Sequence, residues 1–261
     1  MAGARSKTVV FIPGAWMAAE SWDKFRRAFI DAGFTVHSPA WPLLDRGTPP
    51  PQLRRKPPKG LGGMSIEKIV DHYAAFIATL PEKPLIVGHS FGGLFAQLLL
   101  DRGLGVAGIA IDPAPIGGVV PGPRSLGAAL PVIARIAGWS RPHTLSRKAF
   151  AKNFANTATP ELQKEAYDKY VVPTSGRIFH QAAFWWGTFV KPKQRAQPLL
   201  IIVGEEDRTV TPYVARAAFN KQSKSKAKTD FKSFPHLSHF LIGEPGWERV
   251  ASHALDWAGK L

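Results

Sequence analysis

The sequence predicts an α/β fold in which a mostly parallel sheet carries helices on both of its faces. Three observations support this prediction. Short apolar runs alternate with amphipathic segments along most of the chain. One long region, residues 114–196, interrupts this alternation and lacks a convincing strand. The chain has 261 residues, 45% of them hydrophobic, which suffices for one large domain that carries an insertion.

The predicted strands are short runs, mostly of apolar residues, that end near glycine, proline or polar residues. Such continuous apolar runs are typical of parallel strands that are covered on both faces. The runs are residues 8–12, 34–38, 84–88, 106–111, 199–203 and 230–234. Residues 199–203 (LLIIV) are the clearest of them.

Helices are predicted where apolar residues recur every three or four positions between these runs. Ser21 and Ser65 are suitable N-terminal caps for the first two of them. The predicted helices are residues 21–32, 65–80, 90–102, 212–222 and 247–260. Residues 39–63 are rich in proline, glycine and arginine and are predicted to form a loop.

The region 114–196 is predicted to be a helical cap that lies over the ends of the strands. It is helical or irregular in pattern and carries many of the chain's aromatic residues. The expected organisation is therefore a core formed by residues 1–113 and 197–261, with residues 114–196 inserted as the cap.

Composition excludes several classes of protein. The chain contains no cysteine, so disulfides, thiolate catalysis and cysteine-ligated zinc are excluded. No stretch approaches the roughly 18 apolar residues of a membrane span, and the first apolar run is too short for a signal peptide. We expect a cytoplasmic location and no membrane span.

The formal net charge of +15 permits two interpretations. The chain is either an enzyme with a lysine-rich surface or a basic domain that binds a polyanion. No nucleic-acid motif accompanies the basic runs at 54–56 and 221–228, and the aromatic residues concentrate in the predicted cap instead. The first interpretation is favoured, with no nucleic acid as partner.

A G-x-S-x-G motif at residues 88–92 (GHSFG) supplies the candidate nucleophile, Ser90. A predicted strand runs into the motif and a predicted helix leaves it, which is the context of a nucleophile elbow. The glycines allow neighbouring backbone to approach closely, and the start of the helix favours developing negative charge. The alternative is a glycine-rich turn without chemistry.

A serine hydroxyl needs a base to take its proton, and histidine is the base of choice at neutral pH. His239 lies in the loop between the last predicted strand and the last helix, which opens at the same sheet edge as Ser90. His236 is its rival, while His89 and His236 are otherwise interpreted as supporting loop residues.

The acid that orients the histidine is predicted to be Asp207. It follows the strongest strand in the turn GEED, where Glu205 and Glu206 are rivals. Asp112 follows the preceding strand and is the second choice. The order Ser90, Asp207, His239 is nucleophile, acid, base.

These motifs resemble the α/β-hydrolase superfamily, in particular serine esterase-like and lipase-like members with a helical cap, over essentially the whole chain. The resemblance implies a sheet of about eight strands. It also implies an oxyanion hole made by the backbone N–H groups of Phe91 and Ala15, with Trp16 as an alternative to Ala15. Pro13 stands where the family often has histidine, which leaves the choice of donor open.

The implied reaction is cleavage of carboxylic esters or lactones of hydrophobic small molecules through an acyl-serine intermediate. It needs no cofactor and no metal. Hydroxynitrile lyases and cofactor-free perhydrolases use the same triad and are alternatives, as is a non-catalytic basic domain. A homodimer is a further expectation.

The aromatic residues of the predicted cap suggest a substrate pocket above Ser90. Phe184, Trp185 and Trp186, together with Trp16, are expected to form its apolar wall. The alternative is that Phe179, Ala183 and Trp186 only pack the cap against the core.

Overall fold

The computed structural model describes residues 6–44 and 47–261 and is built around one sheet of six parallel strands. Their order is β2-β1-β3-β4-β7-β8, and each neighbouring pair is parallel. The strands are β1 (Thr8–Ile12), β2 (Thr35–His37), β3 (Leu85–His89), β4 (Ala107–Ile111), β7 (Leu199–Gly204) and β8 (Thr229–Phe234). The predicted α/β fold with a parallel sheet is confirmed.

The predicted number of about eight strands is wrong for the described residues. Each of the six apolar runs recognised in the sequence forms a strand of this sheet, with ends that match or differ by one residue. The larger number came from the family resemblance, and the described part of the chain supplies no further strand to this sheet.

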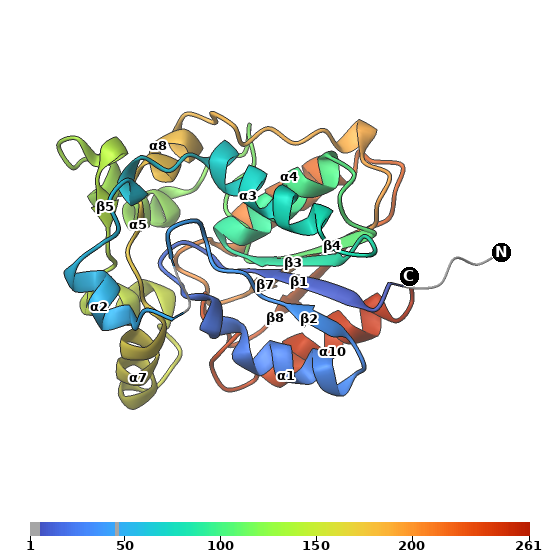
Figure 1. The fold of residues 1–261 in the computed structure, drawn as a ribbon, viewed down its shortest axis with the longest axis horizontal. Helices are drawn as coiled ribbons and strands as arrows, with labels where there is room; N and C mark the ends of the chain where they lie inside the picture. Colours follow the sequence, from blue (N-terminus) through green and yellow to red (C-terminus); the bar gives the residue numbers. More distant parts are fainter. Residues whose placement is uncertain (1–5, 45–46) are drawn as a thin grey trace.

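Helices cover both faces of the sheet (Figure 1). Helices α1 and α10 bury Phe25, Phe29 and Trp257 against one face, and α3, α4 and α9 pack on the other. These helices are α1 (Asp23–Asp31), α3 (Ile66–Ala78), α4 (Phe91–Asp101), α9 (Pro212–Gln222) and α10 (Trp247–Ala258).

The two serines predicted to cap helix N-termini, Ser65 and Ser21, behave differently in the structure. Ser65 caps α3, because its hydroxyl accepts a hydrogen bond from the Lys68 N–H at 3.3 Å. Ser21 does not cap α1. Its hydroxyl instead donates to the Ala18 carbonyl within a 3-10 turn that precedes the helix.

The predicted loop at 39–63 contains helix α2 (Pro50–Arg55) and a 3-10 turn at Leu61–Gly63. Proline is well suited to the first turn of a helix, where its missing N–H is not needed. The side chain of Arg54 donates to the carbonyl groups of Tyr167 and Val171, 3.2 and 2.5 Å away. This long-range contact helps to hold α2 and has no local signature in the sequence.

Residues 114–196 form four α-helices, besides a π-helix and two 3-10 turns, and lie at the carboxyl edge of the sheet (Figure 1). The helices are α5 (Pro123–Ile133), α6 (Arg147–Ala149), α7 (Pro160–Tyr170) and α8 (Arg177–Ala183). The expectation of no strand here is wrong, because β5 (Pro142–His143) pairs antiparallel with β6 (Thr174–Ser175). Strands of two residues are too short to leave a pattern. The division into a core and a separate cap stays a prediction.

None of the helices in the described ranges combines the length and the apolar character that a membrane crossing requires.

The junction of β3 and α4 leaves no room for a side chain at Gly88. A Cβ atom there would lie 2.0 Å from the Gly92 carbonyl oxygen, and a Cβ atom on Gly92 would lie 2.1 Å from the Ile12 carbonyl oxygen. Neither oxygen can move away cheaply, since both belong to the backbone of buried elements. Strand β3 and helix α4 therefore meet more closely than any residue other than glycine at position 88 would permit.

Gly88→Ala should lower the free energy of unfolding by about 3 kcal/mol or more, above the usual cost of overpacking, because backbone must shift. The control is Gly127→Ala in α5, where a Cβ atom meets nothing within 4 Å. That change should raise stability by roughly 0.5–1 kcal/mol. Urea unfolding of both variants checks this, and equal stabilities would contradict the close approach.

Candidate active site

Ser90 occupies a strained turn between β3 and α4. Its backbone angles are φ 55° and ψ −121°, which a residue with a side chain rarely adopts. The turn is held on both sides: the Ser90 N–H donates to the Ile111 carbonyl, and its carbonyl accepts from Ala114 N–H, each at 2.9 Å. These contacts fix Ser90 at the carboxyl end of the sheet.

The loop after β1 packs directly against Ser90. A Cβ atom on Gly14 would lie 2.7 Å from the Ser90 Cβ, so glycine is needed there. Ala15, Trp16 and Phe91 line the same cavity as Ser90. Phe91 is the first residue of α4, and its N–H therefore has no acceptor within the helix. The structure thus brings the predicted oxyanion residues together, while their role stays a prediction.

His239 and Asp207 form a buried pair. His239 Nδ1 lies 2.5 Å from Asp207 Oδ2, and both side chains are shielded from solvent. The other carboxylate oxygen of Asp207 accepts the N–H groups of Thr209 and Val210 at 2.6 and 2.8 Å. The imidazole is therefore fixed in orientation. Its second nitrogen, Nε2, is buried and has no hydrogen-bond partner among the described residues.

His89 brings the serine turn and the histidine loop together. Its Nε2 lies 2.8 Å from the His239 carbonyl oxygen, and the two rings have centroids 4.6 Å apart. Burial, with a further contribution from nearby His239, lowers the pKa of His89 well below its usual value. His89 is therefore neutral and donates Nε2–H to that carbonyl. Since Ser90 follows His89, this bond ties the Ser90 turn to the loop that carries His239.

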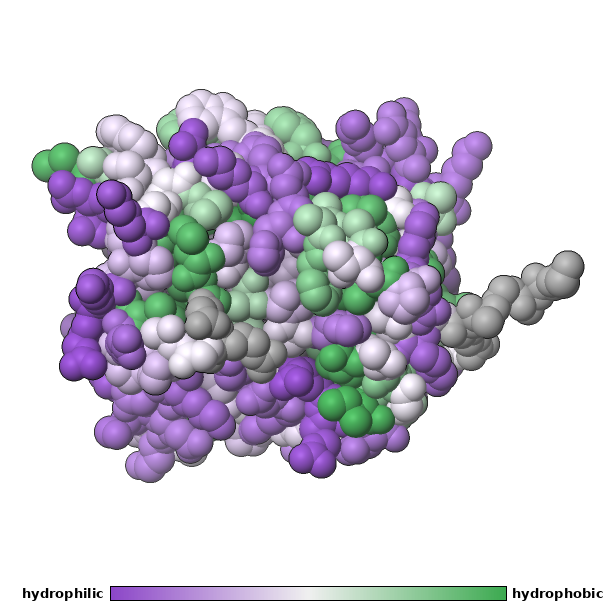
Figure 2. Space-filling view, in the orientation of Figure 1, coloured by the Kyte–Doolittle hydropathy of each residue, from purple (hydrophilic) through white to green (hydrophobic). Residues whose placement is uncertain are grey.

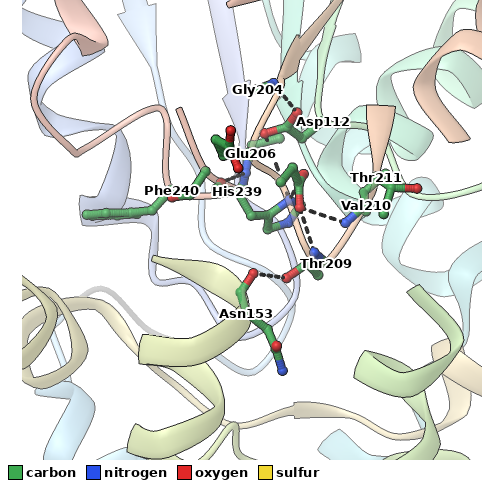
Figure 3. A network of polar contacts seen from close by, with 12 residues as sticks. Asp112, Asn153, Gly204, Glu206, Thr209, Val210, Thr211, His239 and Phe240 are labelled. Carbon is green, nitrogen blue, oxygen red and sulfur yellow. Dashed lines mark hydrogen bonds and ion pairs between the residues drawn. The ribbon is translucent and has the colours of Figure 1, made fainter. Parts of the chain in front are cut away.

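Asp112, the second-choice acid, lies beside the pair without bonding the histidine. Its Oδ2 is 3.8 Å from His239 Nδ1, and its Oδ1 accepts the Gly204 N–H at 2.9 Å (Figure 3). Burial raises the pKa of Asp112 well above its usual value, and the neighbouring Asp207 raises it further. The protonated form of Asp112 is thereby favoured, and geometry favours Asp207 as the partner of His239.

The other rivals face away from Ser90. His236 is exposed, with φ 64°. Glu205 accepts a hydrogen bond from Ser233 at the surface, and Glu206 is exposed. None of the three lines the cavity beside Ser90.

An apolar cavity, partly open to solvent, lies next to Ser90. Besides Ser90, the lining side chains with a polar atom are Trp16, Ser125 and Thr209, and the indole N–H of Trp16 has no hydrogen-bond partner among the described residues. The lining residues are Ala15, Trp16, Ser90, Phe91, Ala114, Pro115, Pro121, Ser125, Leu126, Ala129, Ile133, Phe179, Ala182, Ala183, Thr209 and Val210. Helices α5 and α8 contribute much of this wall.

The pocket prediction is corrected at three of its four positions. Trp16 lines the cavity, whereas Phe184, Trp185 and Trp186 do not. Helix α8 ends at Ala183, and Trp185 has a positive φ of 59°, so the chain turns away at this point. Phe184 and Trp186 stack on each other at the surface. Phe179 is the aromatic residue of α8 that faces the cavity, one turn earlier than expected.

A profile of the Alpha/beta hydrolase family matches residues 9–253. The chain belongs to this family. The predicted family and its hydrolase class are thereby confirmed. A comparison with curated protein sequences gives no match.

Solved structures share the fold of this α/β hydrolase at low sequence identity. Monoacylglycerol lipase from Paleococcus ferrophilus is 24% identical, with a TM-score of 0.72 over 96% of this chain and 93% of that chain. A pyrethroid hydrolase from Sphingobium faniae JZ-2 is 18% identical, with a TM-score of 0.70 over 97% of each chain. Tomato methylketone synthase I with bound 2-tridecanone is 17% identical, with a TM-score of 0.70 over 98% of each.

Glu244 is a site residue that the sequence did not reveal. It is buried, and its carboxylate accepts the N–H and the hydroxyl of Ser238 at 2.6 and 2.9 Å. Thr157 donates to the same carboxylate at 2.5 Å. Glu244 therefore fixes the residue before His239 and ties the histidine loop to the region 114–196. The one signal in the sequence was the presence of an acidic residue, Glu244, shortly after His239 in the same loop.

A second contact fastens the acid turn of this hydrolase to the same region. The Thr209 hydroxyl donates to the Asn153 carbonyl at 2.9 Å (Figure 3). Phe154, next in the chain, packs edge-on against the His239 ring at 4.6 Å. Residues 150–157 thus contact both the turn that carries Asp207 and the ring of His239.

His89, Asp112 and His239 offer ligand atoms that lie within 4.8 Å of one another, the one group in the described part of the chain with metal-ligand geometry. Two of these side chains already serve other partners: His239 binds Asp207, and His89 binds the His239 carbonyl. A metal ion here would compete with the hydrogen bond that orients His239.

The proton on Asp112 makes a testable difference to stability. Above about pH 4 the unfolded chain releases this proton whereas the folded protein keeps it. The folded state then binds more protons, so the parent's free energy of unfolding falls as pH rises. Asparagine does not titrate. Asp112→Asn should therefore gain stability relative to the parent between about pH 4 and pH 7.

Urea unfolding at several pH values measures this gain. Asp31→Asn, at the exposed end of α1, is the control and should follow the parent. Parallel pH profiles for Asp112→Asn and the parent would mean that Asp112 is charged in the folded protein.

Proposed function

We propose that this chain is a serine hydrolase that cleaves carboxylic esters or lactones of hydrophobic small molecules through an acyl-serine intermediate. The observation that carries the proposal is the Asp207–His239 hydrogen bond at 2.5 Å, which leaves a buried, unpartnered Nε2 close to the strained Ser90 turn. A general base for a serine nucleophile needs a free ring nitrogen of this kind, which supports the proposal.

In the first step the Ser90 hydroxyl oxygen attacks the ester carbonyl carbon. His239 Nε2 takes the hydroxyl proton as the new C–O bond forms, and the carbonyl electrons move onto its oxygen. Asp207 stabilises the imidazolium through Nδ1–H. The backbone N–H groups of Ala15 and Phe91 stabilise the oxyanion, with Trp16 as the alternative to Ala15.

In the second step the tetrahedral intermediate collapses and the bond to the alcohol oxygen breaks. His239 returns its proton to the departing alcohol, which leaves an acyl group on Ser90. Water then attacks this acyl group with His239 again as base, and the acid product leaves. For a lactone, both products are parts of one molecule. The cycle uses no cofactor.

The cavity supports a hydrophobic substrate. No charged side chain is among its lining residues, so a charged group placed there would lose its hydration without a partner. Phe179 and Phe91, with ring centroids 5.1 Å apart, offer an aromatic wall beside the nucleophile. The names of the similar lipase and pyrethroid hydrolase agree with such substrates. A cytoplasmic location and a homodimer stay predictions.

The test is kcat/KM over a series of linear acyl esters, with Ser90→Ala as the blank. Each buried methylene contributes about 0.8 kcal/mol, roughly a fourfold gain, until the cavity is full. Phe179→Ala should shift the optimum to longer chains. Phe184→Ala is the matched control, because this exposed phenylalanine lies outside the cavity, and it should leave the profile unchanged.

Ester turnover that survives in Ser90→Ala would reject the proposed nucleophile. A parent without esterase activity would favour the lyase or perhydrolase alternatives on the same triad. A profile that is flat in chain length would reject the hydrophobic cavity as the acyl site.

A further inference from the structure

Large apolar side chains are exposed around the opening of the cavity. Leu126 lines the cavity and is also 46% exposed, so it stands at the opening itself. Ile136 is 87% exposed and Trp186 is 62% exposed. We call the set the mouth surface; its members are Val120, Leu126, Leu130, Ile136, Trp139, Phe184 and Trp186.

Most of the elements that carry the mouth surface pack together. Helices α5 and α8 line the same cavity. His180 of α8 reaches the Ile133 carbonyl at the end of α5, with Nε2 3.3 Å away, and its ring meets Trp139 edge-on at 6.1 Å. Phe184 and Trp186, just after α8, stack at 5.2 Å. On the face shown in Figure 2, hydrophobic and hydrophilic residues are interspersed at the left end of the molecule, where Figure 1 places α5 and α8.

The charge around the mouth surface is positive. Residues 113–160 contain six Lys or Arg residues and no Asp or Glu, and residues 169–204 contain five and none. Arg124, Arg135 and Arg141 are exposed beside the apolar residues. Glu67 of α3 is an acid that reaches α8, and its carboxylate accepts hydrogen bonds from Gln181. An exposed apolar patch within a basic rim is complementary to a partner that is both apolar and anionic.

We infer that the mouth surface docks on an anionic lipid surface. Isolated exposed apolar residues are ordinary, but a cluster of this kind marks an interaction site. Tryptophan and aliphatic side chains enter the interfacial region of a bilayer, while arginine and lysine are attracted by anionic headgroups. A second copy of this chain would bring two surfaces of the same sign together. If nucleic acid were bound instead, the exposed leucine and isoleucine side chains of the mouth surface would have no apolar partner.

Docking in this way would place the cavity opening against the lipid. A hydrophobic substrate could then move from the lipid into the cavity along an apolar path that starts at Leu126. The inference concerns binding and does not depend on the chemistry at Ser90. It also assigns a role to the positive charge of the region 114–196.

The experiment is cosedimentation of the Ser90→Ala protein with phosphatidylcholine vesicles, with and without a minor fraction of phosphatidylglycerol. We expect binding to the anionic vesicles, about tenfold or more above pure phosphatidylcholine, and a loss of most of it at high salt. No binding to anionic vesicles would overturn the inference. Equal binding to duplex DNA, unaffected by changes to apolar residues, would also overturn it and favour nucleic acid.

Two pairs of variants separate the mouth surface from general charge. Leu130→Ser with Ile136→Ser should weaken vesicle binding about tenfold, and Ile30→Ser with Val106→Ser, also exposed, should not. The double variant Arg124→Glu/Arg141→Glu should weaken vesicle binding to a similar extent. The control Lys83→Glu/Lys260→Glu changes the net charge by the same amount away from the mouth surface and should not weaken it. Equal losses in variants and controls would show unspecific attraction and overturn the inference. Melting temperatures confirm that each variant is folded.

Discussion

The close meeting of β3 and α4 is the constraint on which the site depends. Gly88 removes the side chain that would separate β3 from α4, and Gly92 lets α4 approach the end of β1. Ser90 between them takes a backbone conformation that is otherwise unfavourable. Two backbone hydrogen bonds offset the cost of this turn. One joins Ser90 to Ile111, the last residue of β4, and the other joins Ser90 to Ala114, three residues further on. The serine is thereby presented at the carboxyl edge, where the loops that carry the acid and the base also end.

The electrostatics of the site depend on which carboxyl group is charged. Asp112 and Asp207 both lie close to His239, but only Asp207 receives three hydrogen bonds on its carboxylate. Asp112 is buried with one backbone donor and keeps its proton. A single negative charge thus faces the imidazole, and the neutral neighbour supports the Gly204 turn. Glu244 extends this support to the histidine loop.

The sequence predicted what local pattern determines. All six strands of the main sheet were visible as short, largely apolar runs, and the positions of Ser90, Asp207 and His239 after strands followed from parallel topology. It could not show contacts between distant segments, such as Arg54 holding α2 against α7. The aromatic wall was misplaced for the same reason: the left-handed turn at Trp185 that directs Phe184 and Trp186 outward has no clear signature.

The central claim is that His239 activates Ser90. Its most direct test is covalent labelling with a fluorophosphonate, followed by mass spectrometry of the labelled peptide. We expect a single label on Ser90, a rate lowered by about 10²–10⁴ in His239→Ala, and a rate close to the parent in His236→Ala, the exposed histidine of the same loop. A label on another serine, or the same loss in both histidine variants, would contradict the account.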